Sequence, residues 1–208
     1  SLRVPFADLV NADIRQRLSD FVKLGFEFTT YSLGIPDKAT MATINAHGNL
    51  LRNWEIIFPQ KSLPQLGTAI RLARSVFSGQ LFIAPVVPIK EDKGDGKTFQ
   101  HFASHGFSKE DASQIESWLS VLDTPTDDIG LTFRVSPWDD PATQLHEIDQ
   151  ASQRVKLINL QLPRLDEGIY FNDNDKLSSF IVDAYKASQT MLNTTLFIDT
   201  FVDSDRGY

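Results

Sequence analysis

Seven short apolar runs, rich in β-branched and aromatic residues, recur along the chain and predict β-strands. They cover residues 2–6, 26–32, 53–59, 81–87, 129–135, 157–163 and 196–201. Most of the stretches between them carry helix signals, such as Asn11 as a cap before residues 13–23 and Asp140-Pro141 before a helix to residue 155. Alternation of strands and helices predicts a parallel sheet with right-handed crossovers.

A sheet of this kind is either a closed barrel or a doubly wound sheet. No Gly-x-Gly-x-x-Gly or Walker-type loop follows any of the predicted strands. Several strands carry polar residues in mid-run, as expected where side chains point into a barrel mouth. We therefore expect an α/β fold of the TIM-type (β/α)8 barrel class, as one domain over residues 1–208. Because such a barrel has eight strands, we expect the visible ones to be strands two to eight, with the first strand absent.

Composition limits the classes of partner. The 208 residues carry a formal net charge of -7, with scattered basic residues, so we expect neither nucleic acid nor an anionic membrane as a partner. No stretch approaches the roughly 20 apolar residues that cross a bilayer. The absence of cysteine excludes disulfides, thiolate catalysis and cysteine-based zinc sites.

One carboxylate, Glu55, lies inside the apolar run Asn53–Pro59. An unpaired buried carboxylate costs several kcal/mol, so we expect Glu55 to have a partner in another strand. Three charged residues occupy similar strand-like runs and are the candidates to converge with it on one polar centre: Arg3, Arg134 and Asp199.

The order of motifs resembles a clan of glycoside hydrolases that are built on a (β/α)8 barrel with two catalytic glutamates. Leu2-Arg3-Val4-Pro5-Phe6 is similar to the second strand of that clan, whose arginine lies under the sugar. Trp54-Glu55-Ile56-Ile57-Phe58-Pro59 is similar to the first half of its fourth strand, Trp-Glu-x-x-Asn-Glu-Pro. The resemblance implies a barrel with a sugar-like ligand. The chain departs from the clan at both catalytic positions, with Phe58-Pro59 in place of Asn-Glu and Gln161-Leu-Pro-Arg at the end of strand seven.

The leading hypothesis is a carbohydrate-active barrel enzyme that acts on a sugar or sugar-derived acid at the C-terminal rim. Glu55 and Asp199 are the candidate acid and base, one kept protonated by apolar burial and the other kept ionised by an arginine. The alternative for these charges is a structural ion-pair network. The remaining candidates bind substrate through guanidinium forks, stacking aromatic rings or an amide: Arg3, Tyr31, Arg134, Trp138 and Gln161.

Two other functions stay open at this point. A metal-dependent sugar isomerase or epimerase would use Gln161 with strand-end carboxylates and would need a divalent cation, whereas the leading hypothesis requires no cofactor or metal. A non-catalytic barrel that binds a saccharide, or serves as an interaction domain, would explain the missing glutamates. The partner expected under the leading hypothesis is a small carbohydrate or a sugar-derived ligand.

Overall fold

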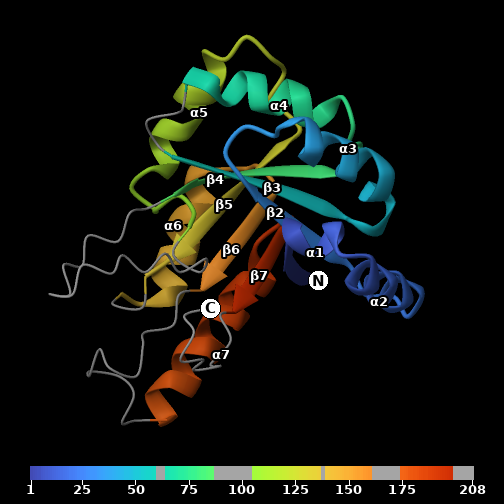
Figure 1. Ribbon diagram of the computed structural model, residues 1–208. Coiled ribbons are helices and arrows are strands. Elements are labelled where there is room, and N and C mark those ends of the chain that lie inside the picture. The colour runs from blue at the N-terminus through green and yellow to red at the C-terminus, as the bar shows by residue number, and fades with distance from the viewer. Residues whose placement is uncertain (60–63, 87–104, 137–138, 161–173, 199–208) are drawn as a thin grey trace, which may run out of the picture. The chain divides into compact units, whose positions relative to one another are not determined.

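Helices and strands alternate along the chain (Figure 1). A computed structural model of the protein describes residues 1–59, 64–86, 105–136, 139–160 and 174–198. The strands are β1 (Leu2–Pro5), β2 (Phe28–Leu33), β3 (Asn53–Pro59), β4 (Gln80–Val86), β5 (Ile129–Val135), β6 (Lys156–Leu160) and β7 (Thr194–Ile198). The helices are α1 (Phe6–Val10), α2 (Ala12–Lys23), α3 (Lys38–His47), the 3-10 turn η1 (Gly48–Leu50), α4 (Leu66–Arg74), α5 (Ala112–Ser120), α6 (Pro141–Ala151) and α7 (Asn174–Thr190).

All seven strands belong to one sheet, and their order across it is the order of the chain. The pairs β1/β2, β2/β3, β5/β6 and β6/β7 are parallel. A doubly wound sheet reverses direction at a switch point, so its strand order departs from the order of the chain. The sheet therefore has the singly wound order of a TIM-type barrel, and the expected α/β fold class is confirmed.

The chain divides into two compact units. Unit 1 comprises Ser1–Pro85 and Ser117–Gly130, and unit 2 comprises Val86–Glu116 and Leu131–Tyr208. Strands β1, β2 and β3 lie in unit 1, and β6 and β7 lie in unit 2. The expectations of a single domain and of a missing first strand stay predictions.

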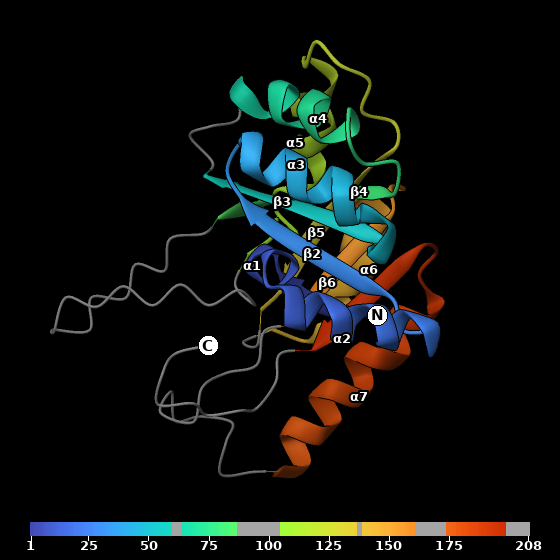
Figure 2. The ribbon, with the colours of Figure 1, turned by 45° about the vertical axis from the view of Figure 1, so that its right-hand side comes forward.

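In unit 1, helices cover one face of the sheet. Figures 1 and 2 both show α3 and α4 side by side on that face of β3. Trp54 packs in the core of this unit: its ring meets Phe77 edge-on with centroids 6.0 Å apart, and its Nε1 donates to Ser32 Oγ at 2.9 Å. Because successive side chains of a strand alternate between faces, Glu55 points to the face opposite Trp54.

The helix caps read from the sequence are present. The Asn11 side chain accepts hydrogen bonds from the N–H groups of Asp13 and Ile14, which fixes the start of α2. The Asp140 carboxylate accepts from Thr143 N at 2.7 Å, ahead of Pro141 at the first position of α6. A side-chain oxygen in this position satisfies an otherwise unpaired N–H of the first turn, so local sequence alone sets these helix starts.

Strand β2 begins at Phe28, two residues later than the apolar run predicts. Phe26 lies in the turn that closes α2, because its N–H donates to Phe21 O and its ring meets the Phe21 ring edge-on, with centroids 5.3 Å apart. Gly25, with φ of 88°, permits this reversal at no steric cost. Phe26 therefore reads as apolar and strand-like but closes the preceding helix.

In unit 2, a charge lies among apolar residues of the sheet. Lys156, the first residue of β6, is only 1% exposed, and its Nζ lies 3.0 Å from Asp149 Oδ1 of α6. It alternates onto the same face as Ile158 and Leu160, both fully buried. Helix α6 therefore supplies the counter-charge for a cation at the start of its neighbouring strand.

Helix α7 is the longest in the described part of the chain and leads directly into β7. Asn193, with φ of 53°, occupies the left-handed region between them, where asparagine is tolerated better than most residues. Strand β7 then starts at Thr194 rather than at the expected residue 196. Among the described helices, neither α7 nor any other combines the length and the apolar character that crossing a bilayer requires.

The segment before α5 pairs with the backbone of β5. Phe107 N donates to Thr132 O at 2.8 Å, and Phe107 O accepts from Arg134 N at 2.9 Å. Gly106 precedes this bridge with φ of 127°, and a Cβ added there would lie 2.9 Å from the carbonyl carbon of Phe133. Glycine is therefore required at residue 106 both by its conformation and by the close approach of β5.

We expect Gly106→Ala to lower the free energy of unfolding by more than about 1 kcal/mol, because alanine is strained at positive φ and its Cβ overlaps the β5 backbone. Urea unfolding measures the change. Gly67→Ala is the matched control, since Gly67 is helical and an added Cβ there meets its nearest atoms at 3.8 Å. Equal stabilities of the two variants would show that the 106–107 bridge does not constrain the fold.

Candidate ligand-binding site

Register places five polar side chains on one face of β1, β2 and β3. Tyr31 pairs with Glu55 across β2 and β3, and Thr29 pairs with both Arg3 and Asn53. Residues paired in register, and residues two apart along a strand, point to the same face. We call these five residues the polar cluster.

Arg3 and Glu55 form the ion pair of this cluster. Arg3 Nη2 donates to Glu55 Oε2, although β2 lies between their two strands. The Glu55 side chain is 0% exposed and that of Arg3 is 13% exposed. The prediction that Glu55 has a charged partner in another strand is thus confirmed, and the partner is Arg3. Such a pair offsets part of the desolvation cost of the buried carboxylate.

The other members of the cluster hold this pair in place. The Arg3 guanidinium lies over the Tyr31 ring, with its Cζ 5.3 Å from the ring centroid, a cation–π arrangement. Asn53 Nδ2 donates to Thr29 Oγ1 at 2.9 Å in a buried hydrogen bond, which fixes the polar layer beside the ion pair. Tyr31 is half-buried, so it and Arg3 are the members through which solvent reaches the cluster.

One oxygen of the Glu55 carboxylate is not used by the described part of the protein. Oε2 accepts from Arg3, whereas Oε1 is buried and has no hydrogen-bond partner among the described residues. A buried carboxylate oxygen that accepts no hydrogen bond is costly. It is also an acceptor that a hydroxyl or N–H group of a ligand would satisfy.

Asp8 is a residue of this region that the sequence interpretation missed. It lies in α1, just after the C-terminal end of β1, where barrel proteins commonly place functional side chains. Burial raises the pKa of Asp8 above its ordinary range. Burial also raises the pKa of Tyr31; Arg3 lowers it, while Asp8 and Glu55 raise it. The signal that would have found Asp8 is an acidic residue three positions beyond a strand end.

Arg134 belongs to unit 2, and its predicted role in binding substrate stays a prediction. Its Nη1 donates to Gly106 O at 2.7 Å, and Asn159, its register partner on β6, donates to His105 O at 2.8 Å. Burial lowers the pKa of Arg134, and the carboxylates of Asp111 and Glu110 oppose that shift. Arg134 and Asn159 therefore anchor the backbone at residues 105 and 106, and Arg134 also lies within the electrostatic reach of the Asp111 and Glu110 carboxylates.

The other predicted site residues, Asp199, Trp138 and Gln161, lie outside the described residues. Their proposed roles as acid or base, stacking ring and polar contact stay predictions. In the part of the chain that the structure describes, no three His, Asp or Glu side chains are grouped closely enough to hold a metal ion.

Replacing Arg3 alone should be more harmful than replacing the whole ion pair. Arg3→Met leaves Glu55 as an uncompensated buried charge, and we expect it to cost about 3 to 5 kcal/mol of unfolding free energy. The double variant Arg3→Met, Glu55→Met removes both charges and should recover most of that loss. Denaturant unfolding of the single and double variants measures the coupling.

The control for this cycle is Arg52→Met, which removes a cation from the exposed pair with Glu27. It should cost no more than about 1 kcal/mol. A similar small cost for Arg3→Met would show that the buried pair does not support the fold.

The Tyr31 phenol should report the charges around it. We expect its pKa, measured as the difference in alkaline absorbance between wild type and Tyr31→Phe, to lie above the ordinary value of 10.0. Asp8→Asn should lower this pKa and Arg3→Met should raise it, while Glu27→Gln, at an exposed pair, should leave it unchanged. Because the folded state holds this proton more tightly, the associated stability is present below pH 10.0 and is lost as pH rises through the raised pKa. If neither Asp8→Asn nor Arg3→Met changed the pKa of Tyr31, the charges of these two residues would not act on its phenol.

Comparisons with known proteins assign no family to the chain. The chain matches no protein-family model, and neither curated proteins nor solved structures include one with significant similarity to it.

Proposed function

We propose that the protein is a carbohydrate-active barrel that binds a sugar or sugar-derived acid at the polar cluster, in the manner of glycoside hydrolases. The observation that carries the proposal is the convergence of Arg3, Tyr31 and Glu55 on one face of β1–β3. The resemblance of the β1 and β3 sequences to the second and fourth strands of that clan supports the same ligand class.

The three side chains offer the contacts that a sugar requires. The Tyr31 ring provides an apolar face for stacking on the C–H face of a pyranose. The Arg3 guanidinium donates in a fork geometry that fits a carboxylate of a sugar acid, or two neighbouring hydroxyls. Glu55 Oε1 accepts a hydrogen bond from a ligand hydroxyl, which satisfies the buried oxygen that the described residues leave unused.

Hydrolysis of a glycoside needs a second carboxyl group besides Glu55. Asp8 supplies one at the end of β1, and its raised pKa suits a proton donor, while Glu55 with its charge compensated by Arg3 suits a base or nucleophile. Asp199, the partner expected from the sequence, stays part of the proposal. With a sugar bound over Tyr31, the donor would protonate the leaving oxygen while either a water deprotonated by Glu55, or Glu55 itself, attacks the anomeric carbon; in the second case water then hydrolyses the glycosyl ester.

Saccharide binding without turnover is the second candidate. The complete burial of Glu55 and its ion pair with Arg3 favour it, since both are also expected of a carboxylate that only orients a ligand. Turnover of an aryl glycoside of the bound sugar, lost in Asp8→Asn, separates hydrolysis from binding alone.

A panel of monosaccharides and sugar acids should contain a ligand that raises the thermal unfolding midpoint of the wild-type protein. A ligand at 100 times its dissociation constant adds about 2.7 kcal/mol of stability. Glu55→Gln keeps the shape of the side chain but exchanges one acceptor oxygen for a donor, so we expect the ligand-induced shift to be abolished or strongly reduced. Differential scanning fluorimetry measures both shifts.

Glu27→Gln is the matched control, since it removes a carboxylate of the same kind from an exposed pair of unit 1. It should keep the full wild-type response to the ligand. The proposal is refuted if no sugar or sugar acid stabilises the wild type, or if Glu55→Gln responds as the wild type does.

A further inference from the structure

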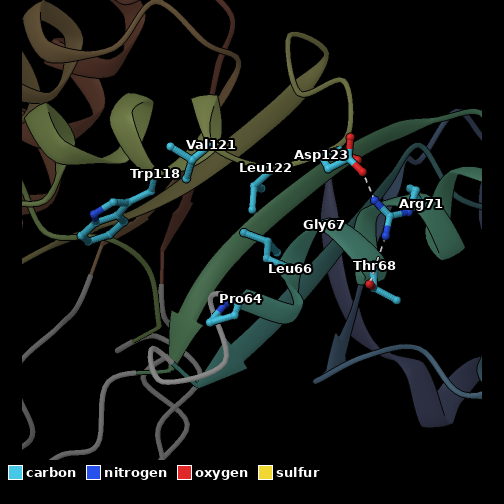
Figure 3. A pocket seen from close by; sticks show the side chains of 9 residues that line it. All are labelled: Pro64, Leu66, Gly67, Thr68, Arg71, Trp118, Val121, Leu122 and Asp123. Atoms are coloured by element: carbon cyan, nitrogen blue, oxygen red, sulfur yellow. Dashed lines mark hydrogen bonds between the residues drawn. The ribbon is translucent and has the colours of Figure 1, made fainter.

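Unit 1 contains a pocket of about 510 Å³ between the start of α4 and the end of α5 (Figure 3). It is separate from the polar cluster and shares no residue with it. This volume lies in the range of roughly 300 to 1,000 Å³ that is usual for sites of small organic ligands. Its lining comprises Pro64, Leu66, Gly67, Thr68, Arg71, Trp118, Val121, Leu122 and Asp123.

Most of the pocket wall is apolar. Leu66 of α4 and Leu122, beyond α5, contribute aliphatic side chains, and Trp118 contributes a half-buried indole (Figure 3). Val121 is 81% exposed although it is β-branched and apolar. An apolar wall containing a tryptophan favours the flat hydrophobic body of an aromatic ligand.

Arg71 is the cation of this pocket, and neutral groups hold it there. Its Nη1 donates to Asp123 O at 2.6 Å, and its Nη2 donates to Thr68 Oγ1 at 3.2 Å, as Figure 3 shows. A guanidinium carries five N–H donors, so these bonds orient it without using all of its capacity. Among the described residues Arg71 forms no ion pair, in contrast to Arg74 one turn later, which pairs with Asp128.

We infer that this pocket is a second binding site, which takes a small aromatic carboxylate. The aromatic body packs against Leu66, Trp118 and Val121, and the carboxylate accepts hydrogen bonds from Arg71. Planar guanidinium groups recognise planar carboxylates through paired hydrogen bonds. The inference does not depend on the proposed sugar site, because the two sites share no residue.

Asp123 is the one acidic residue of the lining. Its carbonyl oxygen holds Arg71, and its side chain is exposed. Its carboxylate weakens the attraction for an anion, so Asp123→Asn should strengthen binding. Asp123→Asn should weaken binding of a cationic ligand and leave that of an uncharged ligand nearly unchanged, so this variant makes the charge of the ligand testable.

The probe is 1-naphthoate, an aromatic carboxylate, with 1-naphthalenemethanol as its uncharged counterpart, and calorimetric titration measures both affinities. Wild type should bind the acid at least about tenfold more tightly than the alcohol, the ratio expected of one charge-assisted hydrogen bond. Arg71→Gln should remove that preference. Arg17→Gln, which changes an exposed arginine of α2 outside the pocket, should keep it.

Val121 allows a second test that does not risk the fold, because its side chain is exposed. Val121→Asp should bind naphthoate less tightly than Val121→Lys, because both variants lose the valine contact but place opposite charges at the pocket. The inference is overturned if wild type binds no naphthoate, if acid and alcohol bind equally, or if the two Val121 variants bind the acid alike.

Discussion

The buried ion pair between Arg3 and Glu55 determines how the first three strands fit together. Glu55 is fully buried, so it is tolerated only where a cation reaches it. Arg3 reaches it from β1 across β2, which requires Arg3, Tyr31 and Glu55 to share one face. A slip of one residue in β3 would turn Glu55 toward the side of Trp54 and leave the charge without its partner. The pair therefore selects the register of three strands at once.

The two arginines that the sequence placed inside strands serve different ends. Arg3 compensates a carboxylate and lies against an aromatic ring, so its charge is what its surroundings require. Arg134 donates a hydrogen bond to the carbonyl oxygen of Gly106, so it serves there as a hydrogen-bond donor to the backbone. Both are arginines in similar apolar runs, and only the neighbouring strand or segment distinguishes them. An arginine in a strand thus predicts a buried acceptor but does not say whether that acceptor is charged.

Patterns local in sequence predicted most of the fold, and contacts distant in sequence account for what they missed. Alternating apolar runs and capping residues such as Asn11 and Asp140 located the strands and helix starts, because each signal acts within one turn or one strand. Phe26 is an exception, because a local motif at the end of α2, with Phe26 packed on Phe21, overrides its strand-like character. The pairing of Glu55 was predictable from the cost of burying a charge, whereas its partner, Arg3, is known only from the contact that the structure shows between β1 and β3. Asp8 was missed because its significance comes from burial beside Tyr31, not from any spacing.

A comparison of two buried charges bears on why the polar cluster is there. Lys156 is buried beside apolar residues of β6 and is matched by Asp149 of the neighbouring helix. Glu55 is matched on one oxygen only, and its second oxygen has no partner among the described residues. A buried ion pair is often no more stabilising than apolar residues of the same size, so stability alone does not favour an acceptor left in this state. A hydrogen-bond donor on Oε1 would remove that cost, and under the proposed function a ligand hydroxyl is that donor.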